Sequence, residues 1–319
     1  MGEDMKESVE EYVAKCATLA MLLEVSGFPK PGNVHRVRDM EDTRFEHFLA
    51  GAVAVGPSMG RLAERGRKAE AGEISVEEIQ VGRFVLESVE AASRWHRGGN
   101  TNLGEILLFA PLSAAAGMCF ASSGEVSAPL LREKTSRVID GTTVEDTIKV
   151  YEAIRLVKPG GLGKVERLDV NDPSFREKIT SERISLKKVF AISAEWDSIS
   201  AEWVNGMKTV FDLGYPSFKM YLEEGSDVNT ATVNTFLRIL SEKPDTLIIR
   251  KAGAEAARYV STKAREALKA GGASTPEGRK LCWMLDEELH GAKGRLNPGT
   301  TADLTAASIF VCLLEGVRY

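Results

Sequence analysis

The sequence predicts an all-α fold: a single domain, residues 1–319, of about ten to twelve helices. Apolar residues recur at helical spacing along most of the chain, whereas alternating runs of β-branched residues bounded by turns are scarce. The segments between the apolar stripes are rich in Gly, Pro and Asn, which are typical of helix ends and turns. No internal repeat is apparent, which argues against a solenoid.

The clearest apolar stripes lie over residues 9–23 and 81–95, each with spacings of three and four residues. Similar patterns predict helices near 43–65, 124–138, 142–157, 197–222, 252–270, 276–290 and 302–316. The most apolar window, 103–121, contains Glu105, Pro111 and glycines. A buried core helix is therefore favoured over a membrane span.

Two short segments, 184–193 and 246–249, are the only plausible strand candidates, and neither has an evident hairpin partner. Loops are expected at 27–40, 97–104, 159–181, 243–253 and 291–301. The loop over 159–181 is long and polar, which is typical of a lid over a binding site, but a simple tether would have the same composition.

Composition restricts the class of function. The net charge is −5, which argues against a general nucleic-acid binder and leaves small molecules as the expected partners. The four cysteines are scattered through apolar stretches without a C-x-x-C pair, so they are expected to be small buried side chains. The acidic N-terminus has no apolar signal core, so a cytoplasmic protein without a membrane partner is expected.

The segment 29–40 combines two prolines and a glycine with cations and a carboxylate. Glu24 lies just upstream of it and Asp39 lies near its end. Cations beside carboxylates in a constrained loop suit a metal–phosphate site, although solvated charges on a helix connection would have the same pattern. The candidate nucleotide ligands here are Lys30, Gly32, Asn33, His35 and Arg36.

The segment 96–105 is expected to end one helix at two glycines and to begin the next. Asn100, Thr101 and Asn102 stand where the new helix presents free N–H groups and the positive end of its dipole. That arrangement predicts an anion site, although plain helix capping explains the same residues.

Two later segments repeat the combination of acid and base. Asp245 precedes Arg250 and Lys251, which fits either a metal–phosphate site or an ordinary surface ion pair. The segment 291–304 has cations in a Gly-rich loop and places Asp303 in the first turn of a helix. There a carboxylate can stabilise the helix dipole, or hold a metal ion or a ribose hydroxyl. No P-loop, Rossmann fingerprint, H-E-x-x-H or G-x-S-x-G motif is present.

Taken in order, the four segments resemble the family of triphosphoribosyl-dephospho-CoA synthases. The family pattern of a Glu, a P-K-P-G loop and an Asp-Met matches Glu24, residues 29–32 and Asp39-Met40. Its N-T-H-x-G motif resembles residues 100–104, its D-T-x-x-x-R-x-G element resembles 245–253, and its P-G-G-S/T-A-D-L motif resembles 298–304. The chain differs at His35, where the family has Asp, at Arg38, which precedes Asp39, and at Asn102, where the family has His.

The resemblance implies transfer of the triphosphoribosyl group of ATP to the ribose 2′-hydroxyl of dephospho-CoA, with loss of adenine. ATP would be a substrate and Mg²⁺ or a similar divalent cation the cofactor. The implied catalytic residues are Asp39 and Asp303, and the implied metal ligands are Glu24, Asp39, Asp245 and Asp303. The implied phosphate ligands are Lys30, Arg36, Arg250 and Lys251, assisted by Asn100, Thr101 and Asn102.

Two alternatives stay open at this point. The three differences from the family pattern allow an enzyme of the same fold that acts on another nucleotide or phosphoribosyl substrate. A non-enzymatic nucleotide-binding protein is the other alternative. The sequence also leaves open whether the protein forms a homodimer.

Overall fold

The structure, a computed structural model, describes residues 7–160 and 168–319. It confirms the all-α prediction: 73% of the chain is helical, and no strand occurs within the described residues. The described residues form fifteen α-helices, more than the ten to twelve predicted. Most of the additional helices are short and lie between residues 175 and 252, where the apolar pattern covers too few turns to stand out.

Both strand candidates are helical in the structure. The segment 184–193 contains α8 (Leu186–Ser193), and the segment 246–249 begins α12 (Thr246–Ala252). A lone strand has no ladder partner for its backbone groups, whereas a short helix satisfies most of them internally. The predicted loop 243–253 is therefore largely helical, because Asp245 caps the first N–H groups of α12.

Two other expectations change in detail. The predicted helix 197–222 is divided into α9 (Ser198–Asn205), the π-helical turn η2 (Val210–Gly214) and α10 (Tyr215–Glu223). Gly206 ends α9 with φ +71°, a conformation that favours glycine. The long loop 159–181 contains α7 (Phe175–Ser181). Residues 161–167 of this loop lie outside the described residues, so the prediction of a lid falls partly on residues that the structure does not describe.

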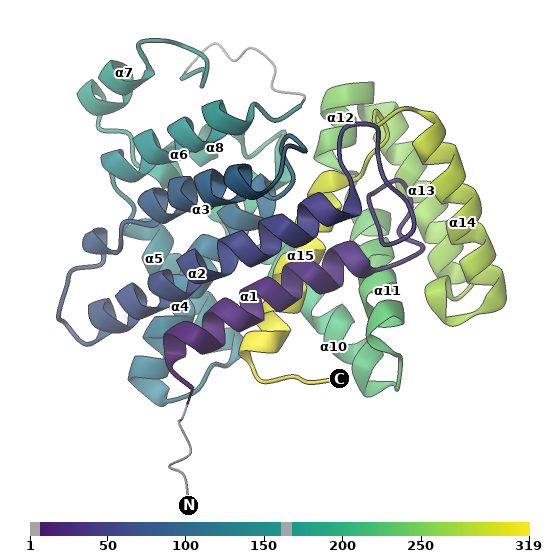
Figure 1. The fold of residues 1–319 in the computed structure, drawn as a ribbon, viewed down its shortest axis with the longest axis horizontal. Coiled ribbons are helices and arrows are strands. Elements are labelled where there is room, and N and C mark those ends of the chain that lie inside the picture. Colours follow the sequence, from purple (N-terminus) through teal and green to yellow (C-terminus); the bar gives the residue numbers. More distant parts are fainter. Residues whose placement is uncertain (1–6, 161–167) are drawn as a thin grey trace, which may run out of the picture.

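The N-terminal part of the chain forms a bundle of long helices (Figure 1). Helix α1 (Val9–Ser26) packs between α2 (Phe45–Glu70) and α15 (Gly299–Leu314), and α2 also packs on α4 (Leu103–Ser123). Helix α3 (Val81–Trp95) follows the short turn η1 (Glu77–Ile79) and packs on α6 (Val144–Val157), while α5 (Ala128–Asp140) packs on α4. These helices enclose the larger of two apolar clusters.

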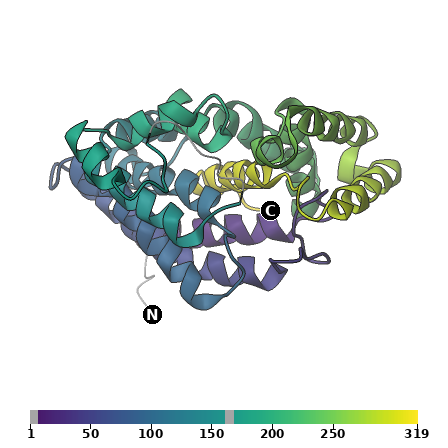
Figure 2. The same ribbon diagram turned by 90° about the horizontal axis from the view of Figure 1, so that it is seen from above.

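Helices α4 and α15 form the centre of the molecule, and Figure 2 shows α15 between the surrounding helices. Helix α4 is long and apolar enough to cross a membrane by length and composition, but 78% of its apolar window is buried inside the protein. That burial agrees with the predicted core helix. The four cysteines are also buried and unpaired, as expected.

The C-terminal helices pack around a second apolar cluster, on the right in Figures 1 and 2. They are α11 (Val228–Glu242), α12, α13 (Ala254–Lys269), the short turn η3 (Gly272–Ser274) and α14 (Pro276–Gly291). Helix α15 contributes to both clusters, because Ala302 belongs to the second and Leu304 to the first. The start of α15 therefore lies where the two clusters meet.

Candidate functional site

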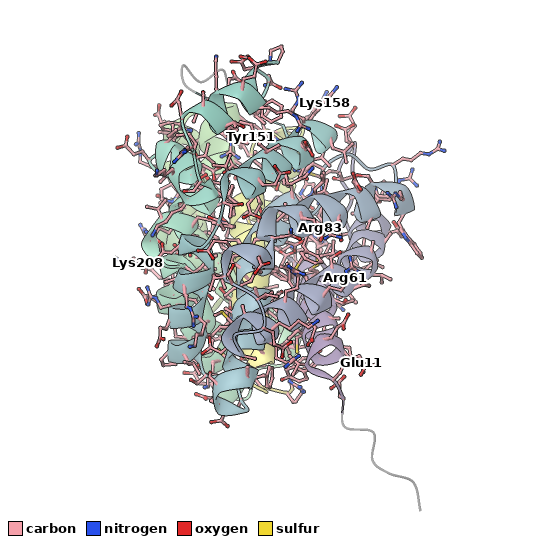
Figure 3. The ribbon with its side chains drawn as sticks, turned by 90° about the vertical axis from the view of Figure 1, so that its left-hand side faces the viewer. Glu11, Arg61, Arg83, Tyr151, Lys158 and Lys208 are labelled. Carbon is pink, nitrogen blue, oxygen red and sulfur yellow. The ribbon has the colours of Figure 1, made fainter. Side chains whose placement is uncertain are left out.

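The four predicted segments converge on one cavity of about 930 Å³. Its lining comes from the end of α1, residues 33–43, residues 99–105, the end of α6, α8 with the start of α9, α12, and residues 290–303. Figure 3 labels Tyr151 and Lys158, two lining residues from α6 and its C-cap, at the end of the molecule remote from the N-terminus. A cavity of this volume accommodates a nucleotide-sized ligand.

The lining is rich in charge of both signs. Among the described residues, eight carboxyl side chains contribute to it: Glu24, Asp39, Glu41, Asp42, Glu105, Asp169, Asp197 and Asp303. Five Lys and Arg side chains from the same part of the chain contribute: Arg38, Lys158, Arg250, Lys251 and Lys293. Because carboxyl groups outnumber basic groups among these residues, additional positive charge would favour the binding of a highly charged anion.

An apolar wall faces the charged residues. It is built largely from α6, α8 and the residues that follow α8, including Tyr151, Val189, Phe190 and Trp196. The Tyr151 hydroxyl donates to the Leu168 carbonyl at 2.7 Å, which fixes the ring, while Trp196 is 41% exposed. Such a wall suits a flat aromatic base or a hydrocarbon chain.

Three carboxylates gather where α1 ends and where α4 and α15 begin. Glu24 and Glu105 are buried, and Asp303 is partly exposed to the cavity. A Cβ on Gly104 would lie 2.1 Å from Oδ2 of Asp303, so only a residue without a side chain permits this approach of α4 to α15. We call Glu24, Glu105 and Asp303 the carboxylate cluster.

Lys30 is the one cation that the described residues pair with the carboxylate cluster, and it pairs with Glu24. Burial, reinforced by the charge of Glu24, raises the pKa of Glu105 to about 8. Burial and the charges of Glu105 and Glu24 also raise the pKa of Asp303 well above its ordinary value. Burial raises the pKa of Glu24 as well, and Lys30 opposes that rise through a 2.5 Å ion pair with Oε1. A cation placed among these groups would favour their ionised forms.

The four predicted metal ligands do not form one site. Among the described residues, no group of three or more His, Cys, Asp or Glu side chains is arranged to hold a metal ion. Glu24 and Asp303 belong to the carboxylate cluster, whereas Asp39 lines the cavity and accepts from the Phe45 N–H at 2.8 Å. Asp39 thereby holds the start of α2.

Asp245 is a structural residue at the junction of two helices. Its Oδ1 accepts from the N–H groups of Leu247 and Ile248 in α12, at 2.8 and 3.2 Å. Its Oδ2 accepts from the N–H and the hydroxyl of Thr301 in α15, at 2.7 and 2.8 Å. Asp245 is 3% exposed and is not among the described lining residues, so the contacts in the structure give it a capping role.

The predicted ligands of the first loop are separated by the fold. Lys30 is fully buried against Glu24, and His35 is fully buried with its Nε2 3.4 Å from Oδ2 of Asp286. The N–H of Gly32 donates to Asp286 as well. Asn33 lines the cavity and donates to Asn297 at 2.8 Å.

Arg36 points away from the cavity. Its Nε donates to the Ser26 carbonyl at 2.6 Å, its Nη2 donates to Asn229, and its guanidinium lies 4.3 Å from the centroid of the Phe28 ring. These contacts fix the loop to α1 and α11, so the side chain has structural partners at Nε, at Nη2 and at the face of its guanidinium group. Arg38, two residues later, lines the cavity instead.

The other predicted ligands lie at or beside the cavity. Asn100 and Thr101 line it, whereas Asn102 is buried and donates to Oε2 of Glu105 at 2.7 Å. Arg250 and Lys251 line it too. Arg250 forms a 2.5 Å ion pair with Asp197.

Lys251 is held at the cavity by one hydrogen bond. Its Nζ donates to the Gly294 carbonyl at 3.2 Å, which links α12 to the loop before α15. Burial and the neighbouring Arg250 lower the pKa of Lys251. A phosphate group beside it would restore the preference for the charged amine.

Sequence reasoning missed several residues at the site. Glu105 carried a usable signal, because it is a carboxylate in the most apolar window of the chain. Asp286 and His290 are spaced i, i+4 on α14, which places them on one helix face. Lys158 and Asp197 carried no motif, since they reach the cavity only through the packing of α6 and α9.

Comparisons with known proteins agree with this arrangement. The model of the family described as CitG, ATP:dephospho-CoA triphosphoribosyl transferase, matches residues 10–318. The 2-(5''-triphosphoribosyl)-3'-dephosphocoenzyme-A synthase of Klebsiella pneumoniae is 26% identical over 306 residues, which cover 94% of this chain and 90% of that protein. A Malonomonas rubra protein that carries the same synthase name is 27% identical, with coverage of 94% and 86%.

A solved structure points to the same family. A protein of Archaeoglobus fulgidus that bears the name of triphosphoribosyl-dephospho-CoA synthase superposes with a TM-score of 0.60 and 28% sequence identity. The match covers 85% of this chain and the whole of the other. The shared fold, the nearly full-length match to the family model and the convergence of the four motifs on one cavity agree: the chain belongs to the CitG family of ATP:dephospho-CoA triphosphoribosyl transferases.

Proposed function

We propose that the protein transfers the triphosphoribosyl group of ATP to the ribose 2′-hydroxyl of dephospho-CoA and releases adenine. The observation that carries this proposal is the carboxylate cluster, which faces a nucleotide-sized cavity with cations in its lining. Family membership supports the reaction type. The protein would work in the cytoplasm, where ATP is available.

The chemistry requires a negative environment at the ribose. Cleavage of the bond between C1′ and N9 of ATP builds positive charge on C1′, as in other glycosyl transfers. A carboxylate held near C1′ stabilises that charge, because it is fixed before the reaction begins. All three members of the carboxylate cluster line the cavity, but Glu24 and Glu105 are buried whereas Asp303 is partly exposed, so we assign this role to Asp303.

The triphosphate requires the opposite charge. Arg250 and Lys251 lie in the lining and would bind phosphate oxygens, and Asn100 and Thr101 could donate further hydrogen bonds. The excess of carboxyl over basic side chains among the described lining residues supports a requirement for Mg²⁺, which commonly binds through one or two carboxylates together with substrate phosphates. Asp303 and Glu105 are the residues that would hold it, and the ion would neutralise triphosphate charge.

The apolar wall would accommodate the uncharged parts of the substrates. Trp196 offers an exposed ring face for stacking with adenine, and the aliphatic side chains of α6 and α8 suit the pantetheine arm of the acceptor. Contact with apolar groups would also exclude water from C1′, which favours transfer over hydrolysis.

A second candidate is an enzyme of the same fold with another acceptor. It is favoured by the residues that differ from the family pattern, because Arg38 lies in the cavity lining and Asn102 holds Glu105. Both would alter the acceptor side of the site without removing the carboxylate cluster or the phosphate-binding cations.

The test is adenine release from ATP and Mg²⁺, measured by chromatography with and without dephospho-CoA, with the product identified by mass. Release that depends on dephospho-CoA supports the proposal. Release with another hydroxyl compound from a panel of nucleosides and coenzymes, but not with dephospho-CoA, would favour the second candidate. If the protein binds ATP but releases no adenine under any of these conditions, both enzyme hypotheses are rejected and a nucleotide-binding protein remains as the alternative.

A further inference from the structure

Another buried carboxylate, Asp286 of α14, organises a histidine at the cavity wall. Asp286 is fully buried and lies one helical turn before His290, which lines the cavity and has only 10% of its side chain exposed. Neither residue has a role in the reaction assigned above. Their geometry nevertheless restricts what the imidazole can do.

The contacts of His290 define its tautomer. Its Nδ1 lies 3.0 Å from the backbone carbonyl oxygen of Asp286 and 3.0 Å from Oδ1 of the same residue. Both oxygens are hydrogen-bond acceptors, so Nδ1 must carry the proton. In a neutral imidazole, Nε2 is then an acceptor with a free lone pair.

Asp286 is held as a carboxylate. Burial alone would raise its pKa, but hydrogen bonds from His290, His35 and the Gly32 N–H hold the pKa below its ordinary value. Arg38 adds a fourth donor, with Nη1 3.3 Å from Oδ2. An ionised Asp286 keeps the proton of His290 on Nδ1 and fixes the orientation of the ring, as a carboxylate does for histidine in many sites.

The Nε2 atom of His290 has no hydrogen-bond partner within the described residues, although it is buried. An unpaired buried acceptor is energetically unfavourable, so it calls for an explanation such as a missing ligand. The position of His290 in the cavity lining supplies one. Because Nε2 is buried, the atoms that cover it must move before a substrate hydroxyl can reach it, and catalytic hydrogen bonds in free enzymes commonly tighten only when the substrate binds.

We propose that Nε2 of His290 accepts the hydrogen bond of the acceptor substrate's hydroxyl group and takes its proton during transfer, with Asp286 as the positioning residue. This inference rests on the proposed function, because it names the base for the same reaction. It also explains His35, predicted as a phosphate ligand: its donor supports Asp286 from within the protein.

The step balances in protons and electrons. The acceptor O–H bond breaks as its proton moves to Nε2, and the oxygen forms the new bond to C1′. The electron pair of the C1′–N9 bond leaves with adenine, which takes up a proton from solvent. The imidazolium later returns its proton to solvent, so no other reactant is needed.

The first experiment reads the tautomer directly, by two-bond ¹H–¹⁵N NMR of the four histidines in the intact protein. His290 should show a protonated Nδ1 and an unprotonated Nε2, and Asp286→Asn should move it toward the Nε2–H form. Addition of dephospho-CoA should then shift the Nε2 resonance. An Nε2–H tautomer in the wild-type protein would overturn the proposal whether or not the protein releases adenine.

The second experiment measures turnover in His290→Gln and Asp286→Asn. A base of this kind contributes on the order of 10²-fold to 10⁴-fold, so His290→Gln should lower kcat by at least about 10²-fold while the KM for ATP changes little. Asp286→Asn should lower kcat less. His47→Gln is the matched control, because His47 lies outside the cavity lining and accepts from the Arg44 N–H at 3.2 Å, a contact that Gln can retain at the start of α2.

The outcomes separate the two proposals. Wild-type turnover in a folded His290→Gln protein, checked by thermal unfolding, would reject the role of His290 and leave the proposed function intact. Absence of adenine release from the wild-type protein with every acceptor would reject the proposed function. In that case the tautomer and the ligand-induced shift of Nε2 would still decide whether His290 contacts a bound hydroxyl compound.

Discussion

Two aspartates near the start of α15 have similar sequence settings and different environments. Asp245 and Asp303 both stand close to a loop–helix junction, and the sequence suggested a metal ligand in each case. Asp245 accepts from four donors of α12 and α15. No hydrogen bond or ion pair from the described residues reaches the Asp303 carboxylate, which faces the cavity. The role of a buried carboxylate therefore depends on the donors that the fold brings to it.

The causes that act on the pKa values of Asp245 and Asp303 show the same difference. Burial raises the pKa of both aspartates. For Asp245, hydrogen bonds from Thr301 and from the N–H groups of Ile248 and Leu247 oppose the rise. For Asp303, the charges of Glu105 and Glu24 increase it. Asp245 is thus stabilised by the fold, whereas Asp303 would be stabilised by a bound cation or by positive charge on a substrate.

Replacing Asp303 should have the largest effect, and it should fall on activity. Asp303→Asn removes the negative charge beside C1′, and we expect kcat for adenine release to fall by about 10²-fold to 10³-fold. Thermal stability should stay equal or rise, because repulsion within the carboxylate cluster decreases. Chromatographic measurement of adenine together with a thermal melt checks both parts. Wild-type turnover in the variant would contradict the role given to Asp303.

Replacing Asp245 should affect stability first. Asp245→Ala leaves the first N–H groups of α12 and that of Thr301 without their acceptor, and each lost cap costs roughly 0.5–2 kcal/mol. We expect the free energy of unfolding to fall by about 2–4 kcal/mol, measured by urea denaturation. Asp245→Asn, which retains one acceptor oxygen, should lose less. An unchanged denaturation midpoint in Asp245→Ala would show that Asp245 does not cap the two helices.

These two aspartates show how far sequence reasoning reaches. Helical spacing was enough to predict the all-α class. The order of the four motifs was enough to predict that distant loops contribute to one cavity. Neither could show that Asp245 meets Thr301 across 56 positions of sequence, because that contact depends on how α12 packs against α15. The same holds for Arg36, whose donors meet Ser26 and Asn229. Glu105 was overlooked because an apolar helix was read as core alone.

The carboxylate cluster should also make stability depend on pH. The pKa of Glu105 is about 8 in the folded protein and near 4.5 in an unfolded chain, so between these values the folded state binds the additional proton. The free energy of unfolding should therefore fall as pH rises from about 5 to about 8, with a slope approaching ~1.4 kcal/mol per pH unit for one proton. Urea denaturation at several pH values should show a flatter profile in Glu105→Gln. Parallel profiles for the two proteins would contradict the raised pKa.

Lys251 and Arg36 allow the same comparison for two cations that the sequence predicts as phosphate ligands. Lys251 lines the cavity with one hydrogen bond to a backbone carbonyl, and its pKa is lowered by burial and by Arg250, so a phosphate would relieve an unfavourable environment. We expect Lys251→Met to raise the KM for ATP by about tenfold, which corresponds to ~1.4 kcal/mol of binding.

Arg36→Met is the matched control for this measurement, because the motif suggested Arg36 as a phosphate ligand while the fold directs it to Phe28 and the Ser26 carbonyl. The KM of Arg36→Met for ATP should stay within about twofold of the wild-type value. The variant should unfold at a lower temperature, since the loop before α2 would lose its contact with α11. Steady-state kinetics over a range of ATP concentrations at saturating Mg²⁺ distinguishes the two variants. Equal increases in KM would mean that Arg36 reaches the triphosphate in the bound state and that the first loop reorganises when ATP binds.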